Sequence, residues 1–475
     1  MYLSVIKVSV PVAEVVGVEE GRVEILPRKS VEDTDKDFTV FYVKRSSSGS
    51  SYGLLWRLGR IQFSCPSRVL RDQWTKHLRT ALKTHSPLRP NRLLVFINPF
   101  GGKKKGRKIY HSLVAPLFEL AGISSHVIVT ERANQARDHL LKKDLKGFDG
   151  VVCVGGDGMF SEILHGLIGR TQQEAGLSEN DPTVALQPCP LHIGIIPAGS
   201  TDCVCYATVG VIDPVTSALH IIIGDSQPLD VCSVHQASAL MRYSVSLLGY
   251  GFYGDVLAES EKHRWMGPLR YDYSGTMVYL SNRSYAGIVQ YLPADPLLSS
   301  PRDRTRCLSG RVYTHVEGRF RCVSLTCMSS SCPKSPLGLS PSAHLADGTG
   351  DLILVWDTHP LGFLKFLYRH TSTQDQFDLP FVEVHRVKAV RFSLPSEMTN
   401  EQKMATPFLC GLCCSKVPAK SVWNCDGEIL SSTEILCRIH GQLVRLYARG
   451  IEEGAAVHNC GKENDKCQMG CTLIK

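Results

Sequence analysis

The chain has 475 residues, of which 43% are hydrophobic and 21% charged, and this composition fits a protein of two or three globular domains. Its formal charge of +8 is modest for this length and favours an anionic partner, such as a phosphate ligand or an acidic membrane face, over nucleic acid. No run approaches the ~18 apolar residues of a membrane span, the amino terminus lacks the features of a secretory signal, and the 18 cysteines follow no disulfide-scaffold spacing. We therefore expect a cytoplasmic protein with reduced thiols whose contact with a membrane is peripheral.

Residues 1–85 are predicted to form a first unit of short strands followed by one helix. Alternating segments at 38–43 and 60–63 predict strands, and a Ser/Gly patch at 46–53 separates them. A helix is predicted over 68–83, where an apolar stripe is formed by Leu70, Trp74, Leu78 and Ala81 and the other faces carry Arg68, Arg71, Lys76, Arg79 and Lys83. The two prolines of HSPLRPN indicate a linker at 86–92.

Three apolar runs further along the chain each end in a turn of small residues. LLVFI at 93–97 leads into NPFGGKKKG, VVCV at 151–154 leads into GGDG, and IGII at 193–196 leads into PAGSTD. Because parallel strands of an α/β sheet place their carboxyl ends on one side, we expect the three turns to meet at one crevice. The lysines of the first turn suit an anion, but the turn is no Walker A loop, since no Ser or Thr follows a Gly-Lys pair. The alternative for these lysines is a solvated loop.

The GGDG turn carries a carboxylate, Asp157, just before a predicted helix. Apolar residues recur at helical spacing in Phe160, Ile163, Leu164, Leu167 and Ile168, so the helix is expected to begin near Met159 and to direct its unpaired N–H groups at the turn. Glycine N–H groups and the helix dipole are expected to hold Asp157 in its charged form. The alternative is a tight strand-to-helix connection in which the glycines supply positive φ and Asp157 only caps the helix.

Five ordered motifs resemble the diacylglycerol-kinase-type catalytic domain of lipid kinases, and within that family they are most similar to the ceramide kinases. The motifs are NPFGGK at 98–103, GGDGMFSE at 155–162, PAGSTD at 197–202, SLLGYGFYGD at 246–255 and WNCDGE at 423–428. The resemblance implies an α/β nucleotide-binding domain at 93–235, a β-rich second lobe at 236–453 and a polar tail at 454–475. It also implies that residues 1–85 are a partial pleckstrin-homology-like domain of β strands and one C-terminal helix.

The resemblance further implies an ATP-dependent lipid kinase that uses Mg²⁺ and phosphorylates the primary hydroxyl of ceramide, giving ceramide 1-phosphate and ADP. Asp157 would be the general base, and the substrate would also meet Gly155, Gly156 and Gly158. The nucleotide would contact Asn98, Pro99, Phe100, Thr130, Glu131, Arg132, Ala133, Asn134, Glu162, Gly199, Ser200, Thr201, Arg264, Arg270, Asp426, Gly427 and Glu428. Of these, the two arginines lie in a predicted helical segment at 259–270, and residues 426–428 would help to organise Mg²⁺. No metal-ligand set is assigned.

One position bears on the choice of lipid. Sphingosine kinases resemble this segment but place an acid shortly before ESEK to meet a charged amine, whereas this chain has Leu257 there and Asp255 two residues earlier. A neutral amide lipid needs no counter-charge, which favours ceramide, although the alternative that Asp255 faces the headgroup and Leu257 lies in the core stays open.

Other functions compete with this interpretation. They are a sphingosine or diacylglycerol kinase, a NAD kinase, which also carries a GGDG turn, and a catalytically idle membrane adaptor. The partners implied by the resemblance are a ceramide-type lipid, an acidic membrane at the cytosolic face of the Golgi or the plasma membrane, and a calcium-dependent regulator, with no role for nucleic acid.

The remaining segments carry weaker patterns. A surface loop is predicted at 292–311, a strand with a cysteine-bearing turn at 318–332, a strand at the end of 335–355 and an exposed stretch at 398–420. Cys410, Cys413 and Cys414 supply too few ligands for a structural zinc site, so reduced or lipid-modified thiols are predicted. Trp423 is predicted to pack rather than to stack on a ligand.

Overall fold

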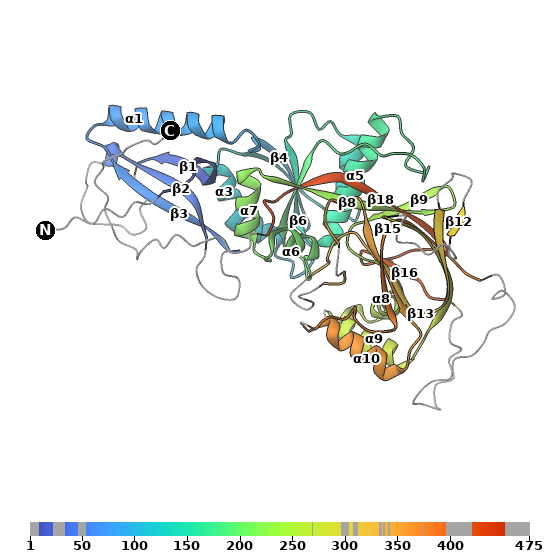
Figure 1. Cartoon of the computed structure of the whole chain (residues 1–475). Coiled ribbons are helices and arrows are strands. Elements are labelled where there is room, and N and C mark those ends of the chain that lie inside the picture. The colour runs from blue at the N-terminus through green and yellow to red at the C-terminus, as the bar shows by residue number, and fades with distance from the viewer. Residues whose placement is uncertain are drawn as a thin grey trace.

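A computed structural model describes residues 9–21, 34–45, 54–267, 269–295, 304–306, 312–331, 335, 338–340, 343–372, 374–395 and 420–451. Figure 1 shows three units in a row: an N-terminal module (β1 to α1), an α/β lobe (β4 to α7) and a β-rich lobe (β8 to β18). Several sequence predictions lie outside the described residues, namely those for the Ser/Gly patch at 46–53, for Cys410, Cys413 and Cys414, for nearly all of 398–420 and for the tail at 454–475.

The N-terminal module is a three-stranded antiparallel sheet in the order β1-β2-β3, with one long helix. Its elements are η1 (Val12–Glu14), β1 (Val15–Glu20), η2 (Thr34–Lys36), β2 (Asp37–Arg45), β3 (Trp56–Ser64) and α1 (Arg68–His85). The sequence pattern did not predict β1. Val15 and Val18 pack in the cluster beneath α1, whereas Val16 packs against the α/β lobe. A strand that is buried on both faces shows no alternation of polar and apolar residues.

Helix α1 buries part of its predicted apolar stripe. Leu70, Trp74 and Leu78 pack, partly buried, against the sheet, and the Ser67 hydroxyl caps the helix by accepting the Leu70 N–H at 3.3 Å. Arg71, which the pattern places off the apolar stripe, is nevertheless only 4% exposed. Charged side chains supplied by β1 and η2 give it partners inside the module.

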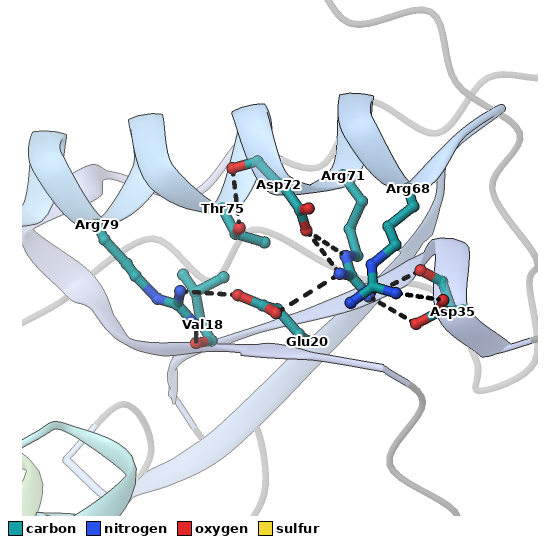
Figure 2. Close-up of polar contacts among 8 residues, drawn as sticks. All are labelled: Val18, Glu20, Asp35, Arg68, Arg71, Asp72, Thr75 and Arg79. Carbon is teal, nitrogen blue, oxygen red and sulfur yellow. Dashed lines mark hydrogen bonds and ion pairs between the residues drawn. The ribbon is translucent and has the colours of Figure 1, made fainter.

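Three arginines of α1 are neutralised within the N-terminal module, as Figure 2 shows. The contacts are Arg71 with Asp72 at 2.6 Å, Arg71 with Asp35 at 3.5 Å and with Glu20 at 3.6 Å, Arg68 with Asp35 at 3.1 Å, and Arg79 with Glu20 at 2.9 Å. These pairs raise the pKa of the Arg71 guanidinium, the hydrogen bond to Asp72 being the largest cause. The positive charge of α1 is therefore largely used to hold the helix on its own sheet.

Trp56 anchors the N-terminal module on the α/β lobe. Its indole ring is 1% exposed and stacks on His220 of α7, with the ring centroids 3.8 Å apart. Glu14 pairs with Arg45 at 2.7 Å and with Arg449 at 3.0 Å, and both guanidinium groups lie near the face of the indole ring. The module is thus held on the α/β lobe and on Arg449 by a packed contact reinforced by charge.

The α/β lobe is built on four parallel strands in the order β7-β6-β4-β5. Its elements are β4 (Arg92–Ile97), α2 (Gly106–Ile109), η3 (Tyr110–Val114, a π-helical turn), α3 (Ala115–Leu120), β5 (Ser124–Val129), α4 (Gln135–Lys142), β6 (Gly150–Gly155), α5 (Asp157–Glu174), β7 (His192–Pro197), α6 (Cys203–Val209) and α7 (Pro214–Ile223). The predicted apolar face of α5 is buried. The helix begins at Asp157 rather than near Met159, because Gly156 already occupies the N-cap position.

The β-rich lobe continues the same sheet. Its strands are β8 (Ser226–Gln236), β9 (Ala239–Ser244), β10 (Leu248–Gly251), β11 (Tyr285–Pro293), β12 (Arg304–Arg306), β13 (Val312–Thr326), β14 (Gly350–Trp356), β15 (Val382–Ser393), β16 (Trp423–Cys425), β17 (Glu428–Ile429) and β18 (Ile435–Tyr447). Strand β18 pairs with β8 along its length and meets β7 of the α/β lobe at Leu446. The joint between the lobes is therefore a strand of the sheet.

Two sequence predictions for this lobe, one of a loop and one of a strand, need correction. Residues 292–293 belong to β11 and residues 304–306 form β12, which pairs with the start of β13, so 292–311 is not simply a surface loop. Strand β13 begins at Val312, earlier than predicted, because it pairs with β11, β12 and β14. Trp423 is 2% exposed and donates its indole N–H to the Thr433 carbonyl at 2.7 Å, so the prediction that it packs is confirmed.

Three helices lie at the far end of the β-rich lobe, away from β18 (Figure 1). They are α8 (Phe252–Lys262), α9 (Leu269–Leu280) and α10 (Pro360–His370), with η4 (Arg264–Met266) between the first two. The predicted helical segment at 259–270 is therefore broken at η4 and Gly267, whose φ is +60°. Among the described residues, no single helix is long and apolar enough to cross a membrane, and one pair bent by 58°, α6 with α7, meets the length and composition criteria together.

Candidate active site

The three glycine-containing turns meet at the carboxyl ends of β4, β6 and β7, as predicted. A Cβ on Gly102 would lie 2.5 Å from the Ala198 carbonyl oxygen, and one on Gly199 would lie 2.5 Å from the Gly156 Cα. The backbones thus approach so closely that larger residues would force the turns apart. Gly158, in contrast, has open space where a Cβ would stand. The GGDG turn therefore presents bare backbone beside Asp157.

The Asp157 carboxylate is held by the first turn of helix α6. Its oxygens accept the N–H groups of Cys203 and Val204, each at 3.2 Å. The expectation that glycine N–H groups hold this carboxylate is wrong, because the start of α6 faces it across the sheet edge. Gly156, not Asp157, is the N-cap of α5, and no side-chain cap bond forms there. The carboxylate thus connects two strand-end turns instead of only capping its own helix.

Asp202 is a second carboxylate at this edge, and the sequence analysis missed it as a site residue. It has a positive φ of 53° and accepts the Gly199 N–H at 3.0 Å. It is only 4% exposed, and this burial, followed by the charge of nearby Asp157, raises its pKa from 3.8 to about 7. Its place at the end of PAGSTD, a third strand-end turn, was the available signal.

A cavity of about 420 Å³ lies between the two lobes. The α/β lobe contributes Asp157, Phe160, Ser161, Leu164, Thr201 and Cys203, and the β-rich lobe contributes Leu247, Phe252, Tyr253, Leu257, Leu339 and His370, among others. Of the sequence-predicted site residues, the cavity wall includes Asp157, Thr201, Asp426 and Gly427. The wall is mostly apolar with a few polar groups at one end, a composition typical of small-molecule and lipid sites.

His370 is a cavity residue for which no sequence pattern gave a signal. It ends α10, its Nδ1 atom is buried, and that atom has no hydrogen-bond partner in the described part of the chain. Burial lowers the pKa of His370 to about 4, opposed by its contact with Gln376. The imidazole is therefore neutral near pH 7 and has an unused hydrogen-bonding atom in the cavity region.

The WNCDGE turn brings Asp426 and Glu428 to the edge of the cavity region. The Asp426 carboxylate accepts the Ser244 hydroxyl at 2.9 Å and the N–H groups of Val245, Ser246 and Leu247 at 2.8–3.1 Å. Burial raises its pKa, and these hydrogen bonds oppose the shift. Asp426 thus organises the connection between β9 and β10, which lines the cavity.

Arg242 connects the two lobes beside this turn. Its guanidinium pairs with Glu428 and donates to the Ser161 hydroxyl on α5 at 3.2 Å. Glu428 is otherwise open to solvent, with a side chain that is 58% exposed. The two acids of the turn therefore differ in their surroundings: Asp426 lines the cavity, and Glu428 is exposed to solvent and paired with Arg242.

The predicted nucleotide residues before α4 lie around the ends of β4 and β5. The Asn98 side chain accepts the N–H groups of Phe100 and Gly101, at 2.9 and 3.1 Å, which fixes the NPFGG turn, and Pro99 lies within that turn. The Thr130 hydroxyl is buried and donates to the Ile97 carbonyl at 3.3 Å. Both residues therefore shape the end of β4.

The following loop, residues 130–134, leads into α4. Gln135 accepts the N–H groups of Glu131 and Arg132, and Ala133 and Asn134 complete the loop, Asn134 with a positive φ of 60°. Glu162 on α5 faces this loop, and its Oε2 atom is buried without a hydrogen-bond partner among the described residues. Burial raises the pKa of Glu162, although the Asn134 and Ala136 amides oppose the shift.

The structure does not place Arg264 and Arg270 in the cavity wall. Both pair with Glu261, Arg264 through Nε at 2.7 Å and Arg270 through a guanidinium nitrogen at 3.2 Å. Arg270 also donates to the Tyr271 hydroxyl at 2.7 Å, and Tyr271 does line the cavity. Lys103, Lys104 and Lys105, by contrast, are exposed and make no ion pair with another described residue.

The two residues of α8 that bear on the choice of lipid, Asp255 and Leu257, have different surroundings. Leu257 is 4% exposed and lines the cavity. Asp255 does not line it: the carboxylate accepts the Tyr285 hydroxyl at 2.6 Å and the Ser421 hydroxyl, and Arg283 lies 3.7 Å away. Burial raises the pKa of Asp255, and these contacts oppose the shift. The acid is thus part of the packing of the β-rich lobe, and the cavity wall at α8 is apolar.

The site fits a nucleotide better than it fits an isolated metal ion. Within the described ranges, no three His, Cys, Asp or Glu side chains are grouped to hold a metal. The exposed Ser200 and Thr201, the free lysines and the unpartnered Glu162 oxygen are groups that an anionic, hydroxyl-bearing ligand can satisfy. Mg²⁺ in kinases is bound by one or two carboxylates together with substrate phosphates, so a complete protein cage is not required.

Comparison with known proteins decides the family. The family model of the ceramide kinase PH domain matches residues 4–78, that of the diacylglycerol kinase catalytic domain matches 92–234, and that of the ceramide kinase C-terminal domain matches 246–462. Ceramide kinase from Homo sapiens is 48% identical to this chain over 94% of this chain and 89% of its own length. The chain belongs to the ceramide kinase family.

Further relatives support the ceramide kinase assignment. Ceramide kinase from Mus musculus is 48% identical over 88% of this chain and 84% of its own length, and that from Oryza sativa subsp. japonica is 32% identical over 80% of each. The crystal structure of a diacylglycerol kinase from Bacillus anthracis aligns with a TM-score of 0.51, covering 76% of this chain and 97% of its own, at 16% identity. At that identity the likeness shows the fold alone, and it confirms the predicted lipid-kinase architecture.

Proposed function

We propose that this chain transfers the γ-phosphate of ATP to the primary hydroxyl of ceramide, giving ceramide 1-phosphate and ADP. The observation that carries the proposal is the cavity between the lobes, which has Asp157 in one wall and an apolar opposite wall. A lipid placed there would bring its headgroup to the strand-end turns while its chains contact the β-rich lobe. Membership of the ceramide kinase family supports ceramide as that lipid.

Asp157 is the proposed general base. Phosphoryl transfer to an alcohol is assisted when a positioned group accepts the hydroxyl proton as the new P–O bond forms. The bonds from Cys203 and Val204 use two of about four lone-pair sites on a carboxylate, so further sites remain for the substrate hydroxyl. Gly158 leaves room for a headgroup to approach, since it faces open space, whereas Gly155 and Gly156 allow the close packing of Met159 and Gly199 that shapes the turn the headgroup would meet.

ATP supplies the phosphoryl group, and Mg²⁺ neutralises charge on its phosphates when both are bound. We propose that the NPFGG turn, residues 130–134 and Glu162 surround the nucleoside, while Gly199, Ser200 and Thr201 meet ribose or phosphate. The WNCDGE turn would supply carboxylates for Mg²⁺: Asp426 lines the cavity, and Glu428 would exchange Arg242 for the ion. Arg264 and Arg270 are proposed phosphate ligands that would exchange Glu261 for the nucleotide.

Leu257 in the cavity wall favours a neutral lipid as the substrate. An acid at this wall would serve a charged amine such as that of sphingosine, but the wall is apolar and Asp255 is engaged by Tyr285 and Ser421. A carboxylate placed there without a counter-charge would also cost free energy through desolvation. Diacylglycerol, which is also neutral, stays the second candidate, and His370 offers the hydrogen-bonding group by which an amide and an ester could be distinguished.

The test is a substrate panel with purified full-length protein, ATP and Mg²⁺. Ceramide, sphingosine, diacylglycerol and NAD are offered separately, and radiolabelled product is quantified. The proposal expects ceramide to be the preferred acceptor. Preference for sphingosine or NAD would overturn the assignment of the neutral cavity, and phosphate on none of them would support the idle-adaptor alternative instead.

The placement in the cell is part of the proposal. The PH domain match supports peripheral association with a membrane. The resemblance to ceramide kinases supports the cytosolic face of the Golgi or the plasma membrane and a calcium-dependent regulator. We further propose that the catalytic unit spans 93–453, with a domain boundary near 235, at the end of β8. Imaging of tagged protein with organelle markers, with and without calcium release, tests the cellular part.

A further inference from the structure

We propose that helices α9 and α10, with Trp265 beside them, form a membrane-docking surface at the mouth of the lipid cavity. This inference rests on the proposed function only in taking a bilayer lipid as substrate. It assigns membrane contact to the catalytic part of the chain, in addition to the N-terminal module. The surface, named here the apolar patch, consists of Trp265, Leu269, Tyr273, Met277, Leu280, Leu361, Leu364 and Tyr368.

Helix α10 is apolar on two opposite faces. Phe363 and Phe366 are buried in a cluster with Phe252, Tyr253 and Tyr279. Leu361, Leu364 and Tyr368 recur at i, i+3 and i+7 on the other face and are 67%, 46% and 64% exposed. A helix that is hydrophobic all round is normally covered on all sides. The outer face of α10 therefore has an apolar stripe without a partner among the described residues.

Helix α9 repeats this arrangement next to α10. Leu269, Tyr273, Met277 and Leu280 fall within one face of the helix and are 41–66% exposed, while Ser274 and Val278 on the opposite face are buried. The two helices are neighbours, since the Tyr279 hydroxyl donates to the Pro360 carbonyl at 3.3 Å. Both lie at the lower end of the β-rich lobe in Figure 1. Exposed apolar stripes on adjacent helices indicate an interaction surface rather than scattered surface residues.

The composition and position of the patch favour a bilayer as the occupant. Trp265 is 82% exposed, and Trp and Tyr are the side chains that favour the boundary between lipid and water. A cationic side chain accompanies it: Lys365 is exposed between the apolar residues of α10, whereas Lys262 and Arg264 beside Trp265 already pair with Glu259 and Glu261. Lys365 would meet an anionic lipid headgroup.

The patch also borders the cavity. Tyr271 of α9 and His370 and Thr371 at the end of α10 line the cavity, while the outer faces of the same helices carry the patch. A lipid leaving a bilayer would thus enter between the helices that contact that bilayer.

Vesicle binding of the full-length protein tests the surface without involving turnover. Vesicles of phosphatidylcholine with phosphatidylserine, containing no ceramide, are mixed with wild type, with the double variant Leu361→Ser/Leu364→Ser and with the control Leu113→Ser/Ile212→Ser, which removes exposed apolar residues of the α/β lobe. We expect about tenfold weaker partitioning for the double variant and less than about twofold change for the control. Tryptophan emission should shift to the blue on vesicle addition in wild type but not in Trp265→Ser.

Vesicle partitioning of the double variant equal to that of wild type would overturn the proposal. If sedimentation velocity then showed loss of self-association in the same variant, the patch would be an interface between copies. Phosphorylation of a short-chain ceramide in detergent is measured in parallel. If neither wild type nor any variant phosphorylated the short-chain ceramide, the proposed function would be contradicted. The vesicle-binding result would not be affected.

Discussion

The two lobes face the same cavity with different chemistry. The α/β lobe supplies backbone turns, two neighbouring carboxylates and hydroxyl groups at the ends of parallel strands. The β-rich lobe supplies apolar side chains inside the cavity and an apolar patch outside it. The difference indicates that phosphate chemistry and lipid handling are divided between the lobes, so substitutions in each should change different measured quantities.

The largest effect is expected from Asp157→Asn. Loss of the general base should lower kcat roughly 10²–10⁴-fold, while the amide oxygen can still accept one N–H group from α6. Partitioning into ceramide-free vesicles should not change, because the β-rich lobe is untouched. Initial-rate kinetics and vesicle sedimentation on the same preparation check this. Retained turnover would show that another group accepts the proton.

Asp202 should make the stability of the α/β lobe depend on pH. Burial and the Asp157 charge raise its folded-state pKa to about 7 from 3.8, so folding favours the protonated form. This contribution to the free energy of unfolding is fully present below about pH 4 and is lost as the pH rises through 7. Between pH 5 and 8 the loss should be on the order of 3 kcal/mol.

Asp202→Asn is the matched variant, because its side-chain oxygen can still accept the Gly199 N–H. Urea unfolding at pH 5 and pH 8 should show a smaller pH dependence for this variant than for wild type. An unchanged difference between the two pH values would mean that other groups carry the titration.

Leu257→Asp tests the apolar wall of the β-rich lobe. A carboxylate at this position should raise KM for ceramide about tenfold and improve relative use of sphingosine, since an unpaired buried charge is costly beside a neutral lipid and useful beside an amine. Leu257→Met serves as the volume control. If ceramide and sphingosine kinetics change in parallel, Leu257 acts only through packing.

The smallest effect is expected from the cations of α1. The double variant Arg68→Gln/Arg79→Gln should change partitioning into phosphatidylserine-containing vesicles by less than about twofold, because both guanidinium groups already pair with carboxylates inside the N-terminal module. A loss of binding comparable to that of the Leu361/Leu364 double variant would shift the membrane contact from the β-rich lobe to α1.

The sequence predicted the elements that follow simple periodicity. The three strands and their turns could be found because a buried parallel strand is a continuous apolar run and its carboxyl end is fixed by topology. The donors to Asp157 could not be found, since they lie on α6, 46 and 47 residues away. The burial of Arg71 could not be predicted, because it depends on acids from β1 and η2. His370 joins the cavity only through the packing of α10.

Strand β18 has a mechanical consequence for the enzyme. Nine of its residues pair with β8 within the β-rich lobe, and Leu446 pairs with Ile193 of β7, so one strand carries the sheet from one lobe into the other. Access to the cleft would then come from twisting of a common sheet or from movement of the helices at its rim. A chain ending before residue 435 would lose this shared strand, and with it the rigid alignment of donor and acceptor sites.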